Sequence, residues 1–154
     1  MNEHTQTAIQ IAAEVCKVFE GYSSKPYICP AGFWTVGYGH RCPKDHPEIH
    51  KGEAMLILRK DLVSAATASL RWCPVLAKES PGRLAAIIDW TFNLGSGRLQ
   101  GSTMRRRINE LKWEEAAIEC AKWNRGGGRI LSGLVKRRAI EVKLLLPTMP
   151  HTAR

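Results

Sequence analysis

Residues 19–40 read FEGYSSKPYICPAGFWTVGYGH, and this stretch decides the fold. Before it, apolar side chains recur from Ile9 to Phe19 at the spacing of an amphipathic helix that ends near Phe19 or Glu20. Within residues 21–40, glycines and prolines alternate with aromatic and β-branched residues, a composition typical of short strands joined by turns. The sequence therefore predicts a helix followed by a small hairpin or three-stranded sheet.

The rest of the chain is predicted to be helical. Apolar spacing, first-turn capping residues and the prolines and glycines that end segments define five further helices. They are expected over residues 51 to about 72, 81 to 92, 104 to 111, 113 to about 123, and 130 to 146, the last after a Gly126-Gly127-Gly128 turn. We therefore expect one domain over residues 1–154, of the α+β class but mostly α, with a hairpin region at 20–40 packed against a helical body at 51–146.

Length and charge narrow the class of protein. The 154 residues, 44% of them hydrophobic, fit one globular domain, and no apolar run reaches the roughly 18 residues of a membrane span. The net charge of +9 is uneven, because residues 1–97 hold 10 basic and 9 acidic side chains whereas residues 98–154 hold 13 and 5. A basic C-terminal third predicts an anionic partner such as a nucleic acid or a cell-envelope polymer.

Neither a secretory signal nor a metal site is expected. Glu3 and His4 stand where a signal peptide is basic, and polar residues interrupt the apolar run, so we expect the chain to stay in the cytoplasm after synthesis. The five cysteines are irregularly spaced, which favours reduced thiols. Prolines break the cluster of possible ligands in residues 40–50, whose spacing matches no usual zinc pattern. These candidate ligands are His40, Cys42, His46 and His50.

Three side chains around the hairpin are candidates for chemistry. Glu20 ends the first predicted helix, where the helix dipole and partial burial would both favour a protonated carboxyl that can act as a general acid. The hairpin would fold Cys29 and Thr35 back toward that helix end, adding a thiol and a hydroxyl that can hold a water. Read from spacing alone, the same residues also fit a solvated glutamate, a buried cysteine and a strand threonine.

The whole chain resembles the phage-type lysozymes, glycoside hydrolase family 24. Those enzymes have a Glu, eight residues, an Asp or in some members a Cys, then five residues and a Thr, a pattern that Glu20, Cys29 and Thr35 satisfy. The likeness continues in the Gly-Tyr-Gly-His end of the hairpin and in later segments. These include residues 89–95, Ser102-Thr103, Trp123, residues 127–129, residues 133–135, Arg137-Arg138 and Glu141.

The resemblance implies a lysozyme-like fold and a muramidase. Such an endolysin hydrolyses the β-1,4 bond between N-acetylmuramic acid and N-acetylglucosamine in peptidoglycan, without a cofactor, and lyses the bacterial host. It implies that Glu20 is the acid, that Cys29 stands in the place of a second carboxylate, and that Thr35 orients water or its neighbour. It also implies a separate holin for release from the host cytoplasm.

Cys29 is the departure from the usual pattern. At neutral pH an aspartate is anionic whereas a free thiol is mostly neutral, so three roles stay open for Cys29: thiolate base, covalent nucleophile, or a polar neighbour of a water held by Thr35. A disulfide from Cys29 to Cys16 or Cys42 would silence the enzyme until it is reduced.

Two other functions are compatible with the sequence. A lytic transglycosylase cuts the same bond but uses the sugar's own 6-hydroxyl in place of water. A non-catalytic basic module would bind wall polymer or nucleic acid through residues 98–154. Given the resemblance, we expect a monomer that acts on peptidoglycan, is held by anionic envelope polymers through residues 98–154, and does not bind nucleic acid.

Overall fold

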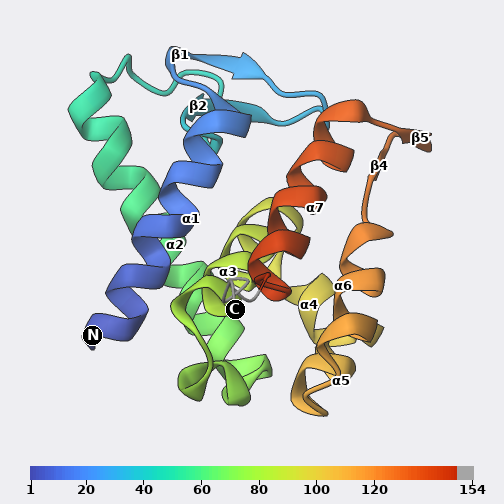
Figure 1. Ribbon diagram of the computed structural model, residues 1–154. Helices are drawn as coiled ribbons and strands as arrows, with labels where there is room; N and C mark the ends of the chain where they lie inside the picture. Colours follow the sequence, from blue (N-terminus) through green and yellow to red (C-terminus); the bar gives the residue numbers. More distant parts are fainter. Residues whose placement is uncertain (149–154) are drawn as a thin grey trace.

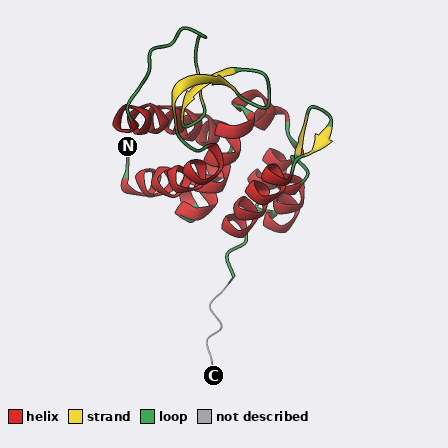
Figure 2. Ribbon diagram, turned by 90° about the horizontal axis from the view of Figure 1, so that it is seen from above, coloured by secondary structure: helices red, strands yellow, loops and turns green. Residues whose placement is uncertain are grey.

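The computed structural model describes residues 1–148, and in it a small sheet lies at one end of a helical body (Figure 1). The fold class is therefore confirmed as mostly α with a small antiparallel sheet. Helix α1 (Glu3–Glu20) leads into strands β1 (Ser23–Ile28), β2 (Trp34–Gly37) and β3 (His40–Arg41), which pair in that order. In Figure 2 these strands lie along one edge of the molecule, beside the helices.

The helical body follows the predicted order with two additions. Helix α2 (Lys51–Trp72), α3 (Pro81–Leu94), α5 (Thr103–Asn109), α6 (Trp113–Ala121) and α7 (Ser132–Leu145) match the predicted segments closely. A 3₁₀ turn, η1 (Pro74–Lys78), and a short helix, α4 (Ser96–Gly101), occupy stretches that were expected to be loops. The glycine turn before α7 is a two-stranded hairpin of β4 (Arg125–Gly126) and β5 (Arg129–Ile130).

Helix α3 forms the centre of the core. Its residues from Leu84 to Trp90 are all buried, and α3 packs against α1, α2 and α7. Ser80 caps its first turn by accepting a hydrogen bond from the Arg83 N–H, and Pro81 occupies the first helical position, where its missing N–H costs nothing. Because α1, α2 and α7 all rest on α3, polar side chains of α3 that face inward lie between the N-terminal and C-terminal helices.

Candidate active site

Glu20 is the last residue of α1, and two glycines shape its surroundings. Gly21 ends the helix with a φ of 65°, and its N–H donates to the Lys17 carbonyl. Gly39, in the turn between β2 and β3, lies directly against the Glu20 side chain, since a Cβ there would come within 2.8 Å of Glu20 Oε2. Gly39 also has a φ of +77°, which disfavours other residues. The carboxylate of Glu20 is thus held at the junction of the helix and the sheet.

Cys29 and Thr35 share one face of the hairpin. The Cys29 N–H donates to the Phe33 carbonyl at 2.9 Å and closes the turn between β1 and β2. Tyr27 pairs with Thr35 across the strands, and Cys29 follows Tyr27 by two residues, so all three side chains project from the same face. Thr35 is buried and its hydroxyl donates to the Phe33 carbonyl at 3.0 Å.

The hairpin makes the Cys29 thiol more acidic than an ordinary thiol. Partial burial opposes ionisation, but hydrogen bonds from the Phe33 N–H, the Thr35 hydroxyl and the N–H groups of Ala31 and Gly32 outweigh it and lower the pKa of Cys29. Thr35 has a single hydroxyl proton, which can lie on the Phe33 carbonyl when the thiol is neutral and turn to the sulfur when it ionises. The hairpin therefore makes it easier for Cys29 to form the thiolate that its first and second roles require.

Tyr27 connects the hairpin face to the end of α1. Burial, then the negative charge of Glu20 and then that of Cys29 raise the pKa of the Tyr27 phenol. The phenol is therefore within electrostatic reach of both groups. Of the three residues singled out from the sequence, Cys29 and Thr35 thus lie together on the hairpin, and Tyr27 lies within electrostatic reach of both Cys29 and Glu20.

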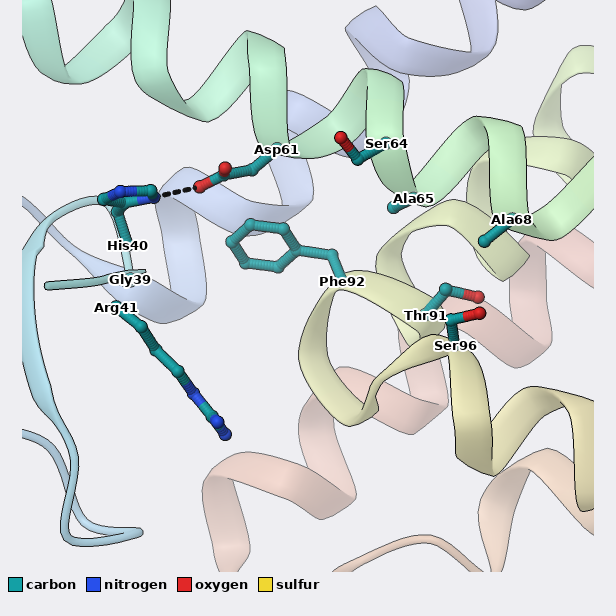
Figure 3. A pocket seen from close by; sticks show the side chains of 10 residues that line it. All are labelled: Gly39, His40, Arg41, Asp61, Ser64, Ala65, Ala68, Thr91, Phe92 and Ser96. Carbon is teal, nitrogen blue, oxygen red and sulfur yellow. Dashed lines mark hydrogen bonds and ion pairs between the residues drawn. The ribbon is translucent and has the colours of Figure 1, made fainter.

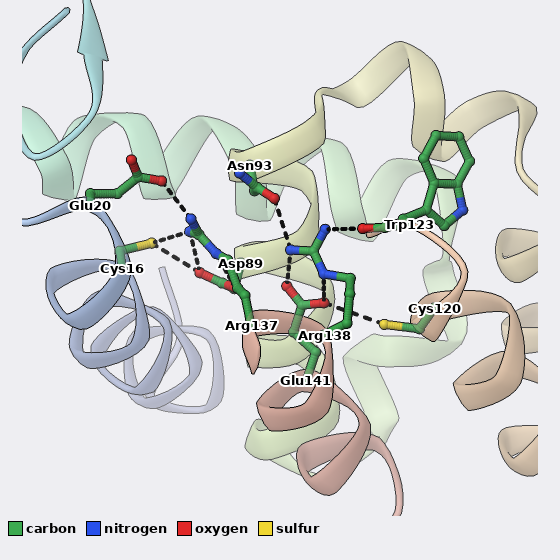
Figure 4. A network of polar contacts seen from close by, with 9 residues as sticks. All are labelled: Cys16, Glu20, Asp89, Asn93, Cys120, Trp123, Arg137, Arg138 and Glu141. Atoms are coloured by element: carbon green, nitrogen blue, oxygen red, sulfur yellow. Dashed lines mark hydrogen bonds and ion pairs between the residues drawn. The ribbon is translucent and has the colours of Figure 1, made fainter. Parts of the chain in front are cut away.

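Arg137, on α7, is a site residue that the sequence analysis named only as part of the family resemblance, with no role. Its side chain is 3% exposed and its Nη1 contacts Glu20 Oε1 at 2.5 Å (Figure 4). Its Nε and Nη2 donate to both carboxylate oxygens of Asp89 at 2.9 and 2.8 Å. Glu141 is taken by Arg138 instead, with an Nη2 to Oε1 distance of 2.7 Å. The side of α7 that carries Arg137 faces α1 and α3, where two carboxylates satisfy it.

This arginine changes the electrostatics expected of Glu20. The sequence placed Glu20 only at a helix end, whereas the structure adds a guanidinium in direct contact with its side chain. The Glu20 side chain retains 21% exposure, so it can reach both Arg137 and a bound molecule.

A pocket of about 380 Å³ lies beside the turn that holds Glu20 (Figure 3). It is bounded by Gly39 and His40 on one side and by α2 and the ends of α3 on the other. His40 Nδ1 contacts Asp61 Oδ2 at 2.7 Å, and Phe92 projects into the space between these elements. Hydroxyl groups and one arginine add hydrogen-bonding capacity around an apolar floor, a combination that suits a carbohydrate. These polar groups come from Arg41, Ser64, Thr91 and Ser96.

Comparison with known proteins decides the family. The phage lysozyme family model matches residues 17–141. The chain belongs to the phage lysozyme family. It is 33% identical over 131 residues to the SAR-endolysin of Enterobacteria phage P21, an alignment that covers 82% of this chain and 77% of that protein. Among solved structures, the muramidase domain of SpmX from Asticaccaulis excentricus superimposes with a TM-score of 0.78 at 28% identity, covering 89% of this chain and 95% of that one.

The relatives differ in length. The endolysin of Bacillus phage B103 is 33% identical over 141 residues, which cover 89% of this chain but 53% of that protein. The chain thus spans about half the length of this curated relative.

No metal centre or membrane-spanning helix is found in the part of the family fold that the structure describes. Within residues 1–148, no three or more His, Cys, Asp or Glu side chains gather closely enough to hold a metal ion, and no helix is long and apolar enough to cross a membrane. His40 contacts Asp61, and His46 contacts the Pro47 carbonyl, so these two histidines of the 40–50 segment do not converge.

The cysteine geometry disfavours the disulfide switch. All five thiols are free. Cys42 lies beside Trp34, on the side of β2 opposite to β1, so it is about 9–10 Å from the end of β1, beyond the roughly 7 Å that a disulfide spans between Cα atoms. Cys16 is buried and donates to Asp89 Oδ1 at 3.1 Å inside the helical body. Neither thiol is placed to bond Cys29 without movement of the backbone.

Proposed function

We propose that this chain is the catalytic domain of an endolysin that hydrolyses the β-1,4 bond between N-acetylmuramic acid and N-acetylglucosamine in peptidoglycan. The observation that carries the proposal is Glu20, held by Arg137 against Gly39 of the pocket and linked through Tyr27 to the hairpin face of Cys29 and Thr35. Membership of the phage lysozyme family supports the same conclusion.

Glu20 acts as the general acid in this proposal. Cleavage of a glycosidic bond requires a proton on the leaving oxygen while positive charge develops on the sugar ring. Glu20 lies against Gly39, which lines the pocket, and its partial exposure would allow contact with a sugar bound beside Gly39. The anionic form left after proton transfer is stabilised by Arg137.

Cys29 and Thr35 act on the opposite side of the bond. The lowered pKa of Cys29 supports a thiolate that either accepts a proton from the attacking water or attacks the sugar carbon itself. In the third role, Cys29 is a polar neighbour of a water held by Thr35. The hydroxyl of Thr35 serves all three roles because it can turn between sulfur, water and the Phe33 carbonyl.

The basic C-terminal third would hold the enzyme against the anionic envelope. Within residues 98–148, Arg107, Lys112 and Lys122 are neutralised by neighbouring glutamates, and Arg137 and Arg138 are buried. The other basic side chains of this segment have no acidic partner in the described structure and can face an anionic polymer. Six of them are exposed, Arg98, Arg106, Arg125, Arg129, Lys136 and Lys143, whereas Arg105 is half-buried and donates to the Trp72 and Gln100 carbonyls. A monomer, residence in the host cytoplasm and release by a separate holin stay predictions from the resemblance.

Digestion of purified peptidoglycan tests the proposal. The wild-type protein should release muropeptides with reducing ends, and Glu20→Gln, which keeps size and polarity but cannot donate the same proton, should be about 10²- to 10⁴-fold slower. Products with 1,6-anhydro ends would show a transglycosylase. Binding without any product from the wild-type protein would show the non-catalytic module, and equal activity of Glu20→Gln would refute the role of this residue.

A further inference from the structure

Asp89 is a buried carboxylate that the mechanism above does not use. It lies on α3, is 0% exposed, and follows and precedes buried apolar residues of that helix. Both of its oxygens accept hydrogen bonds from Arg137, at 2.8 and 2.9 Å, and Oδ1 also accepts from the Cys16 thiol. Arg137 in turn contacts Glu20. A continuous chain of contacts therefore leads from Asp89 through Arg137 to the proposed acid, and Figure 4 shows these groups in line.

The charged groups in this series of contacts are one cation, Arg137, and two carboxylates, Asp89 and Glu20, so they do not form separate pairs. One guanidinium, held among buried side chains, contacts two carboxylates, so the attraction that it offers Glu20 is already shared with Asp89. A buried charge is compensated by the partner that contacts it, and a two-point arginine–carboxylate contact is the stronger kind. Asp89 thus fixes Arg137 and neutralises most of its charge. The remaining guanidinium nitrogen, Nη1, contacts Glu20.

We propose that Asp89 is a positioning residue that, through Arg137, both fixes the direction of the Glu20 carboxylate and weakens the hold of the guanidinium on it, so that Glu20 keeps the proton that catalysis needs. The inference rests on the proposed function, because it assigns Asp89 a part in the acid step. Asp89 does not touch the substrate region and acts only through Arg137.

The second ion pair of the network keeps Asp89 charged. Burial opposes the charge on Asp89, but hydrogen bonds and attraction from Arg137 lower its pKa, whereas burial and a hydrogen bond with Asp89 raise the pKa of Glu141. Of the two coupled carboxylates, Glu141 is thus the easier to protonate; it contacts Arg138 and accepts a hydrogen bond from the Cys120 thiol. A proton that enters this buried network therefore goes to Glu141 before Asp89, and Asp89 remains the anion opposite Arg137.

Few other charges face Glu20. Tyr27 from β1 and Cys16 from α1 are within electrostatic reach, and burial raises the pKa of both groups, so both stay neutral at moderate pH. The neighbouring turn contributes Gly39 and, next to it, His40, whose ring contacts Asp61 of α2. Arg137 is the cation in contact with Glu20, and its balance with Asp89 dominates the electrostatics at this position.

The test is the pH dependence of peptidoglycan hydrolysis by Asp89→Asn. The substitution preserves the shape of the side chain and one hydrogen-bond acceptor for Arg137, but it removes the negative charge. Glu20 is then the one carboxylate left in contact with Arg137, and this contact favours its ionised form. A general acid that ionises more readily loses activity at lower pH, so the alkaline limb of the rate profile should shift to lower pH by about one unit. A merely structural role would lower the rate at every pH and leave the limb in place, and that result would overturn the proposal.

Two matched variants show whether the effect passes through Arg137. In an Arg137→Gln background, Asp89→Asn should no longer move the limb; the same shift in that background would overturn the proposal. Glu141→Gln removes a charge from the same buried network but leaves the Asp89–Arg137–Glu20 contacts in place, so it should leave the limb unchanged. A shift as large as that of Asp89→Asn would show that loss of any charge in the network moves the limb, and it would contradict the specific role proposed for Asp89.

If Asp89→Asn does not fold, carboxyl ¹³C NMR of the wild-type protein still tests the proposal. Asp89 should be ionised at the pH of the assay and should take up a proton only at lower pH than Glu141; a protonated Asp89 would overturn the proposal because a neutral group cannot compensate Arg137. The proposed function fails separately, if wild-type protein releases no products or Glu20→Gln is fully active. An active wild type, an inactive Glu20→Gln and an unmoved limb for Asp89→Asn would refute the present inference alone.

Discussion

Replacing Thr35 with valine should make the Cys29 thiol less acidic while leaving the hairpin folded. Valine fills nearly the same volume in a position that is 3% exposed, but it cannot donate a hydrogen bond. The Thr35 hydroxyl is one of the donors that lower the pKa of Cys29 against the opposing effect of burial. Its removal should therefore raise that pKa toward the value of an ordinary thiol.

The size of the pKa change follows from the two acceptors that the Thr35 hydroxyl proton can reach, the Phe33 carbonyl and the Cys29 sulfur. A hydrogen bond to a charged group contributes about 1.5–3 kcal/mol and a neutral one about 1 kcal/mol. When Cys29 ionises, the hydroxyl exchanges the Phe33 carbonyl for the thiolate, so the gain is the difference, about 0.5–2 kcal/mol. Because water competes for the partly exposed sulfur, we expect the lower half of this range. It corresponds to an increase of about 0.4–0.9 pKa units for Cys29 in Thr35→Val.

Alkylation by iodoacetamide measures this directly, because the thiolate is the reactive form. Burial raises the pKa of Cys73 to about 12 and raises those of Cys16, Cys42 and Cys120 as well, so Cys29 should be modified first. Rates are followed across pH by intact mass, with peptide mapping and a Cys42→Ala control to identify the site. An unchanged midpoint in Thr35→Val, or first modification at another cysteine, would refute the reasoning.

Four further outcomes are expected. Gly39→Ala should destabilise the fold by about 1–3 kcal/mol in urea denaturation, because it forces a side chain into a positive φ, and should lower activity because its Cβ displaces Glu20. Arg138→Met leaves the fully buried Glu141 without its cation; since Glu141 can take up a proton, we expect the lower end of the usual 3–5 kcal/mol loss, about 3, and a loss below about 1 would refute this. On purified cell walls, Cys29→Ala should lose activity and Cys29→Asp should retain it; full activity of Cys29→Ala would show that the thiol is dispensable. Raising the salt concentration should weaken wall binding without changing which bond is cut, as measured by sedimentation and by analysis of the digest.

The parts of the fold that were predictable carry their signal locally. The period of apolar residues in α1 and α2, and the prolines beside α2 and α3, define those helices within a few residues. The short elements carry no such signal. Helix α4 contains Gly97 and Gly101, which disfavour a helix, and it forms because Leu99 is buried in the core. Strands β4 and β5 have two residues each, too few for any alternation.

The candidate site divides in the same way. Glu20, Cys29 and Thr35 lie within 16 consecutive residues, so a helix end and a hairpin are enough to bring them to one region. The contact of Arg137 with Glu20 joins residues 117 positions apart, and depends on how α7 packs against α1 and α3. A search for buried charges that require partners would have singled out Asp89 inside the apolar run of α3, but only the packing of the helices shows which arginine reaches it.

In the proposed function, the basic C-terminal third has two electrostatic roles that salt can separate. Arg137 and Arg138 face inward, where carboxylates from α1, α3 and α7 compensate them, whereas the unpaired cations of α4 to α7 face solvent. Salt screens exposed charges over about 10 Å at 0.1 M but screens buried pairs much less. Binding to intact walls should therefore fall as salt is added, while the alkaline limb of the rate profile on short soluble muropeptides stays fixed. A limb that moved with salt in step with wall binding would show that exposed charges, and not the Asp89–Arg137 pair, control the acid.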